Sequence, residues 1–258
     1  MSTGKVHLSV QDGIAAVVFD RPEARNAMTW SMYDELAAIC QNLAQRDDIR
    51  AATLRGAGGQ AFVAGTDIEQ FLAFESGEDG IRYEAVIDER VQLLESLPFP
   101  TVAVIDGYAI GGGLAMAAAC DFRVATPAAV FGVPIARTLG NCLSSANTAR
   151  VVAGFGAART KRMLLLAETI GASEARDCGF VHDIAEPDAL DAKVAALCQR
   201  LAGNAPLTIK AAKETIRRLI VADLPRNDDL VRECYGSRDF RIGIEAFMAK
   251  QRPDWTGR

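Results

Sequence analysis

Hydrophobic residues at the start of the chain predict a β-hairpin followed by a helix and a strand. Two short apolar runs at residues 6–10 and 14–19 are separated by an Asp-Gly step, which favours a tight turn between paired strands. Thr29 is a suitable cap for a helix that runs to about residue 45, with apolar residues recurring on one face. Residues 51–54 then resume as a strand.

The middle of the chain alternates helical and strand patterns, and its end is helical. A helix over residues 80–97 leads into the unbroken apolar run 101–105, which suits a strand buried on both faces, and a glycine-rich turn follows. After Pro187 the strand patterns stop. Helices are predicted there over residues 188–202, 206–221 and 230–250. We therefore expect an α/β core over residues 1–187 and a helical region over residues 188–258.

Composition and charge exclude several classes of protein. With 258 residues, 50% of them hydrophobic and 24% charged, the chain can bury a large core. A net charge of -5 without a long basic run argues against a nucleic-acid partner. The six cysteines form no close pair of the kind that metal sites or redox motifs use. The apolar runs suit neither a signal peptide nor a membrane span, so we expect a cytoplasmic protein with no metal and no membrane partner.

Two glycine-containing turns are the candidate chemical site. The first covers residues 61–68 and the second covers residues 107–114, and each precedes a predicted helix. Glycine lets the main chain approach a ligand closely, and a helix start leaves unpaired N–H groups with a partial positive charge. Two such donors aimed at one point would form an oxyanion hole, which stabilises negative charge on a carbonyl oxygen.

With these turns in place, the chain resembles the crotonase superfamily, also called the enoyl-CoA hydratase/isomerase superfamily. Residues 20–28 are similar to the opening turn of that family, and residues 64–68 and 107–121 are similar to its two oxyanion segments. The tail is similar in three short segments, at residues 204–206, 211–213 and 256–258. The set of segments, in this order and spacing, covers the full length of the chain.

The resemblance implies a spiral of β-β-α units with a C-terminal helical trimerisation region, assembled as a homotrimer or hexamer. The implied substrate is an acyl-CoA thioester, in which coenzyme A is part of the substrate and no separate cofactor is needed. The implied oxyanion donors are the backbone N–H groups of Ala64 and Gly112. The implied coenzyme A contacts are Ala24, Arg25, Ala27, Thr66, Asp67, Ile68, Phe247 and Lys250, the last two reaching a neighbouring subunit's coenzyme A. A solvated position near a helix end is the other interpretation of Lys250.

The sequence departs from the family at the two glutamates with which a hydratase holds and activates water. The first position falls on Ala115 and the second on Ile135 or Ala136, and none of these side chains can move a proton. The polar residues of the following loop are Arg137, Asn141, Cys142 and Ser144. We take Arg137 and Asn141 as the candidate replacements; a structural ion pair is the other interpretation of Arg137.

We therefore expect an acyl-CoA-processing enzyme of the enoyl-CoA hydratase/isomerase type, either a lyase or an isomerase, that stabilises a thioester enolate. Simple hydration is not expected of it, because the usual acid and base are missing. The alternative is a non-catalytic protein on the same fold that binds acyl-CoA or a protein partner. Such a protein would also keep the two turns and lose the two glutamates.

Overall fold

A six-stranded and a four-stranded sheet organise the structure, a computed structural model that describes residues 3–258. The large sheet has the order β1-β2-β3-β5-β7-β10 and is antiparallel only between β1 and β2. The small sheet has the order β4-β6-β8-β9 and is antiparallel only between β8 and β9. The strands are β1 (Lys5–Gln11), β2 (Ile14–Asp20), β3 (Ala51–Gly56), β4 (Ala61–Val63), β5 (Thr101–Ile105), β6 (Tyr108–Ile110), β7 (Phe122–Ala125), β8 (Val130–Gly132), β9 (Thr169–Gly171) and β10 (Asp183–Ile184).

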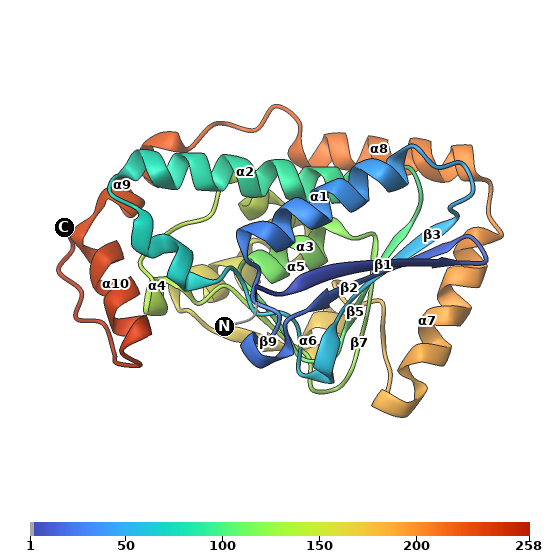
Figure 1. The fold of residues 1–258 in the computed structure, drawn as a ribbon, viewed down its shortest axis with the longest axis horizontal. Helices are drawn as coiled ribbons and strands as arrows, with labels where there is room; N and C mark the ends of the chain where they lie inside the picture. The colour runs from blue at the N-terminus through green and yellow to red at the C-terminus, as the bar shows by residue number, and fades with distance from the viewer. Residues whose placement is uncertain (1–2) are drawn as a thin grey trace.

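Successive pairs of strands divide between the two sheets. β3, β5 and β7 lie side by side in the large sheet, and β4, β6 and β8 follow them in the same order in the small sheet. A helical segment returns the chain after each pair, so the chain winds as a spiral of β-β-α units (Figure 1). These segments are α2 (Gly77–Glu95), α3 (Gly112–Ala119), and α4 (Ile135–Thr138) with α5 (Ser145–Leu165). The expected α/β spiral is confirmed.

The predicted hairpin and first helix are also present. β1 and β2 pair in register around Asp12 and Gly13, whose φ angles of 50° and 76° are those of a tight hairpin turn. Helix α1 (Trp30–Ala44) begins after Thr29, whose side chain accepts a hydrogen bond from the N–H of Met32. Three short helical turns lie between the strands and helices of the first half of the chain, and a fourth lies between β9 and β10. They are η1 (Pro22–Ala24), η2 (Ala57–Gly59), η3 (Ile68–Ala73) and α6 (Ala172–Asp177).

Strand β5 is buried on both faces, as its unbroken apolar run predicted. Ala103 and Ile105 belong to the main core beneath α1, α2 and α3, whereas Val102 and Val104 pack against α7 (Pro187–Ala202) on the opposite face of the sheet. A strand in the middle of a parallel sheet must bury both sets of alternating side chains. This strand leads directly into β6 and the second glycine turn.

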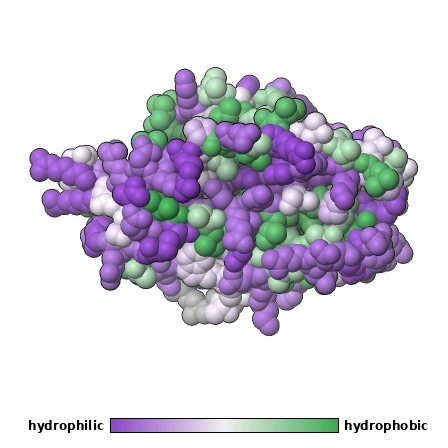
Figure 2. All heavy atoms as spheres, turned by 90° about the horizontal axis from the view of Figure 1, so that it is seen from above, coloured by the Kyte–Doolittle hydropathy of each residue, from purple (hydrophilic) through white to green (hydrophobic). Residues whose placement is uncertain are grey.

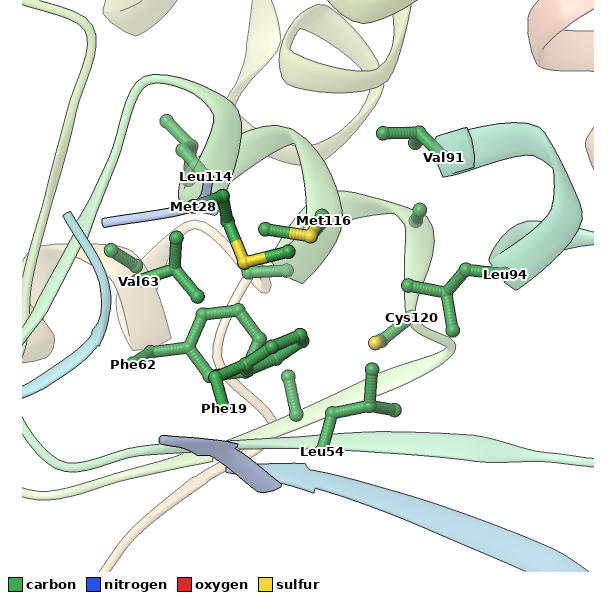
Figure 3. Packing of buried hydrophobic residues seen from close by; sticks show 14 of the residues in the cluster. Phe19, Met28, Leu54, Phe62, Val63, Val91, Leu94, Leu114, Met116 and Cys120 are labelled. Atoms are coloured by element: carbon green, nitrogen blue, oxygen red, sulfur yellow. The ribbon is translucent and has the colours of Figure 1, made fainter. Parts of the chain in front are cut away.

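Figure 3 shows part of the main core, including Val63 and Leu114, which flank the two glycine turns. Phe19 from β2 and Phe62 from β4 meet edge to face, with ring centroids 5.5 Å apart. Met28 and Met116 lie next to these rings and connect them to helix α3. All four side chains are fully buried. The segments on either side of the turns are therefore held by close packing, which keeps the backbone between them in place.

The C-terminal region contains four helices where three were predicted. These are α7, α8 (Pro206–Val221), α9 (Asp228–Gly236) and α10 (Arg238–Met248). The prediction of one helix over residues 230–250 was wrong, because Ser237 is extended (φ -74°, ψ 157°) and caps α10 by accepting from the N–H of Phe240. The division of the chain at residue 187 stays a prediction.

Candidate active site

A cavity of about 560 Å³ lies between the two glycine turns, helix α2, the loop before α5 and the end of α10. The turns supply Gly65, Thr66, Gly111 and Gly112 to its wall. In both turns a glycine with positive φ precedes a candidate donor: Gly65 (96°) precedes Thr66, and Gly111 (55°) precedes Gly112. That backbone conformation strongly favours glycine, and it turns the next peptide plane away from the strand.

The N–H of Thr66 is free to meet a ligand. The carbonyl of Gly65 accepts from Met28 N–H at 2.8 Å, and the N–H of Asp67 donates to Met28 C=O at 2.9 Å. In a trans peptide the C=O and the following N–H point in opposite directions, so Thr66 N–H points away from Met28. Within residues 3–258 it has no acceptor.

The N–H of Gly112 is free in the same way. The carbonyl of Gly111 accepts from Ala115 N–H at 3.1 Å along helix α3, so the N–H of Gly112 points outward from the positive end of the helix. In the part of the chain that the structure describes, this N–H also has no acceptor. A Cβ placed on Gly112 would lie 3.7 Å from Oγ1 of Thr66, so the two donors belong to neighbouring turns.

The prediction that Ala64 supplies one donor is wrong. Its N–H already donates to the carbonyl of Arg25 at 3.1 Å, on the side of the strand opposite to Thr66 N–H. In a regular strand the N–H groups of residues 64 and 66 would point to the same side, but the positive φ of Gly65 breaks the extended path between them. The N–H of Ala64 is therefore directed to the segment of residues 25–28, and the N–H of Thr66 is directed away from it. The donor pair that the fold offers is Thr66 and Gly112.

Behind these donors, three hydroxyl groups form a buried chain. Oγ1 of Thr66 is 2.9 Å from the Tyr33 hydroxyl and 2.6 Å from the Tyr83 hydroxyl. Burial raises the pKa of both phenols well above the ordinary value for tyrosine, so they stay protonated. This chain fixes the side chain of Thr66 and connects the first turn to α1 and α2.

Glu84 is a buried carboxyl group in the cavity wall, and the sequence analysis did not identify it. Its Oε1 accepts from the Tyr235 hydroxyl at 2.6 Å and its Oε2 accepts from Ser144 N–H at 2.9 Å. Burial raises the pKa of Glu84 to about 7, although the Tyr235 and Ser144 hydrogen bonds act in the opposite direction. Both protonation states are therefore populated near neutral pH.

Glycines on α2 allow the close contact that brings Tyr235 to Glu84. A Cβ on Gly80 would lie 2.2 Å from Cγ of Tyr235, and a Cβ on Gly77 would lie 2.2 Å from the Arg232 carbonyl oxygen. Larger residues at these positions would separate α2 from α9. The sequence signal for Glu84 was its place in the buried stripe of α2, one turn from Gly80 and three residues from Ile87.

The two predicted catalytic side chains have different positions. Asn141 lines the cavity, and its Nδ2 donates to the Tyr235 hydroxyl at 3.0 Å. Arg137 is exposed on α4 and does not line the cavity, so the prediction of a catalytic role for it is wrong. The helical turn of α4 points the Arg137 side chain to solvent, while Ile135 and Thr138 on the same turn face inward.

Ala115 and Ile135 both line the cavity, at the positions where the family's glutamates were expected. Ala115 is 1% exposed, and Ala136, the other candidate for the second position, is exposed and outside the cavity wall. The two positions where glutamates were expected therefore carry methyl and sec-butyl side chains. The cavity is apolar there, and the buried carboxyl group in its wall comes from α2 instead.

The residues assigned to coenzyme A lie at the cavity wall, with one exception. Arg25 stacks its guanidinium over the Tyr108 ring, 5.0 Å from the centroid, and Asp67 is ion-paired with the buried Arg21 at 2.7 Å. Lys250 is exposed and outside the wall of this chain's cavity. The assigned residues in the wall are Ala24, Arg25, Ala27, Thr66, Asp67, Ile68 and Phe247.

No helix within residues 3–258 is long enough and apolar enough to cross a membrane. In the same residues no group of three or more histidine, cysteine or acidic side chains is placed to hold a metal ion.

Comparisons with known proteins agree with this geometry. The sequence model of the family "Enoyl-CoA hydratase/isomerase" matches residues 9–258. The enoyl-CoA isomerase/hydratase fer4 of Mycosarcoma maydis is 31% identical, over 95% of this chain and 93% of its own length. A solved enoyl-CoA hydratase/carnithine racemase from Magnetospirillum magneticum is 32% identical with a TM-score of 0.80, covering 100% of this chain and 97% of that one.

A solved methylmalonyl-CoA decarboxylase has the higher TM-score of 0.90, covering 100% of both chains, but at 23% identity it shows only the shared fold. The match of the family's sequence model to nearly the whole chain, together with the spiral fold and the paired turns, settles the family. The chain belongs to the enoyl-CoA hydratase/isomerase family, within the crotonase superfamily.

Proposed function

We propose that this protein binds an acyl-CoA thioester in the cavity and stabilises its enolate with the N–H groups of Thr66 and Gly112. The observation that carries the proposal is that these two N–H groups lie on neighbouring turns of the cavity wall and have no acceptor within residues 3–258. An enolate places negative charge on the thioester oxygen, and preorganised donors in a water-poor site stabilise that charge strongly. Losing one such donor typically costs about 3–4 kcal/mol of the barrier.

The reaction best supported is one that moves a proton next to the thioester carbonyl, such as a double-bond shift in an enoyl group. Water addition in this family's manner needs two carboxyl groups, and Ala115 and Ile135 offer none. A proton shift needs the oxyanion donors and one group that takes and returns a proton. We therefore favour an isomerase or a lyase over a hydratase.

Deuterium incorporation into an acyl-CoA tests enolate formation directly. Butyryl-CoA incubated with the protein in D₂O should gain deuterium at the carbon next to the carbonyl, measured by mass spectrometry. Gly112→Val should abolish the gain, because its side chain would crowd the donor. Its melting temperature is measured alongside, because a Cβ there would also lie 3.0 Å from the buried Tyr33 hydroxyl. Gly171→Ala is the matched control, since a Cβ there meets open space.

A non-catalytic acyl-CoA-binding protein would give a different result in the same experiment. Butyryl-CoA would raise its melting temperature, because binding stabilises the native state, but no deuterium would enter the acyl group. That outcome would refute the enzyme proposal and support the alternative.

We expect assembly through the C-terminal helices as a homotrimer or hexamer. Helix α8 has no buried residue in the single chain, and its apolar side chains Leu207, Ile216 and Leu219 are exposed. Figure 2 views the molecule from above, where α8 lies in Figure 1, and hydrophobic patches alternate there with hydrophilic side chains. Sedimentation should give a trimer or hexamer, and Leu219→Glu should weaken it. A cytoplasmic location stays a prediction.

A further inference from the structure

Glu84 is the buried carboxyl group of the cavity wall. The other two acidic residues of the wall are Asp67, which is ion-paired with Arg21, and Glu69, which is exposed. No histidine, lysine or cysteine lines the cavity within residues 3–258. The Tyr83 hydroxyl also lies there, but its raised pKa keeps its proton in place at neutral pH. Among the carboxyl groups of the wall, Glu84 is thus the one that is buried and has no ion-pair partner within residues 3–258.

Hydrogen bonds hold the Glu84 carboxyl group in a defined orientation but leave part of its capacity to accept hydrogen bonds unused. Each of its oxygens accepts one hydrogen bond, Oε1 from the Tyr235 hydroxyl and Oε2 from Ser144 N–H. A carboxylate oxygen has two lone pairs, so each retains one that can accept a proton. Ser144 is also the N-cap of the long helix α5, whose positive end faces the carboxylate.

The charges around Glu84 keep both of its protonation states accessible. Asp88, one turn along α2, disfavours the carboxylate form of Glu84. The Asp88 carboxylate itself accepts a hydrogen bond from the Ser144 hydroxyl at 2.6 Å and lies 3.9 Å from the Arg150 guanidinium. From α9, Tyr235 donates to Glu84. The thiol of Cys142 on the intervening loop has a raised pKa and stays neutral. No positive group among the described residues pairs directly with Glu84.

We propose that Glu84 is the proton-transfer residue of this protein, replacing the two glutamates that its family uses. The proposal rests on the function proposed above. The Glu84 carboxylate takes a proton from the acyl carbon next to the carbonyl. The C–H electron pair forms the C=C bond of the enolate, and the carbonyl π pair moves onto the oxygen held by Thr66 and Gly112. When the electrons return, the Glu84 carboxylic acid gives its proton back.

The proton can return to the same carbon, which exchanges it, or to carbon 4 of a 3-enoyl group, which leaves the double bond between carbons 2 and 3. Both outcomes conserve atoms and electrons and need no other reactant. A single carboxyl group serves both steps, because near neutral pH it is a base before the transfer and an acid after it. Tyr235 and Asn141 act as positioning residues, since they touch Glu84 directly or through each other.

Glu84→Gln tests the proposal, with Glu89→Gln as the control on the same helix, where the side chain is exposed. The glutamine keeps the size and can still accept hydrogen bonds but cannot take a proton. We expect deuterium incorporation into butyryl-CoA to fall by about 100-fold or more in Glu84→Gln. The dissociation constant for butyryl-CoA, measured by calorimetry, should change by less than about threefold. Glu89→Gln should match the wild type in both measurements.

Incorporation in Glu84→Gln within about threefold of the wild type would overturn the role of Glu84 and leave the oxyanion hole untouched. No incorporation by the wild type would instead refute the proposed function. If Glu84→Gln fails to fold, Glu84→Asp takes its place. Glu84→Asp should keep some activity, and its exchange rate should still rise with the loss of one proton. The pH midpoint of that rise should differ from that of the wild type, and an unmoved midpoint would count against the proposal.

Discussion

The hydroxyl of Tyr235 on α9 lies 2.6 Å from Oε1 of Glu84 on α2, although 151 residues separate them in the sequence. This hydrogen bond crosses from the C-terminal helices to the wall of the cavity. Asn141 donates to the same hydroxyl, so the single phenolic proton is directed to Glu84. The protonation of Glu84 is therefore sensitive to a residue far away in the chain.

Tyr235→Phe should move the pH dependence of proton exchange upward. The hydrogen bond from Tyr235 favours the charged carboxylate, so its loss should raise the pKa of Glu84 above its present value of about 7. Because the base form is the carboxylate, the rise of exchange rate with pH should shift to higher pH. Deuterium incorporation measured from pH 5 to 9 checks this. An unchanged midpoint would show that the bond does not influence the reacting group.

The stability of the wild type should fall with rising pH because of Glu84. Its folded pKa of about 7 lies above the unfolded value of 4.5, so the folded state holds more protons between these values. The stabilising contribution is complete below pH 4.5 and is lost as pH rises to about 7. Relative to Glu84→Gln, the wild type should lose about 2–3 kcal/mol between pH 5 and pH 8. Urea unfolding of both proteins at the two pH values measures the difference; parallel pH dependences would contradict the assignment.

Hydration of crotonyl-CoA should be slow, and Arg137→Ala should not change it. General acid–base catalysis typically contributes about 10²–10⁴-fold, and the two positions that supply it in a hydratase are apolar here. Arg137 is exposed, so truncating it removes nothing from the cavity. Loss of the crotonyl-CoA double-bond absorbance gives the rate. Turnover at the level of ordinary hydratases, or a large loss in Arg137→Ala, would contradict the structure of the site.

Gly113→Ala should destabilise the protein, whereas Gly112→Ala should mainly reduce its activity. A Cβ on Gly113 would lie 2.0 Å from the Val63 carbonyl oxygen, so α3 and β4 would have to separate. Such overpacking typically costs about 1–3 kcal/mol, or roughly 3–10 °C in melting temperature. At Gly112 the new Cβ would meet the Tyr33 hydroxyl at 3.0 Å and Oγ1 of Thr66 at 3.7 Å, both of them side-chain atoms and not backbone. Thermal unfolding and deuterium incorporation, measured for both variants, should therefore separate them; equal melting temperatures would refute this.

Much of the fold could be predicted from local patterns. The hairpin at Asp12-Gly13, the cap at Thr29 and the buried strand at residues 101–105 follow from turn chemistry, capping and hydrophobic periodicity, and the structure has all three. The break at Ser237 was missed, because residues 230–250 keep a helical pattern across it. A cap in the interior of such a pattern is recognised only when its hydrogen bond to Phe240 N–H is seen.

The site was harder to predict, because its chemistry depends on backbone direction and long-range contacts. Whether Ala64 or Thr66 offers a free N–H depends on the pairing with residues 25–28, which the sequence does not state. Glu84 was missed because a charged residue in a helix is ordinarily solvated, and its partners Ser144 and Tyr235 are 60 and 151 residues away. Arg137 was favoured by its charge, but the rotation of a single helical turn places it outside.

The glycine turns and the carboxyl group stand on separate pieces of chain. The turns belong to the rigid sheet layer, while Glu84 sits on α2 and depends on α9 for its hydrogen bond. In the proposed mechanism, the binding of the thioester oxygen and the transfer of the proton therefore depend on two separate parts of the fold. On this proposal, an acidic residue placed on a different helix would change where the proton is taken up, while the two backbone donors stay the same.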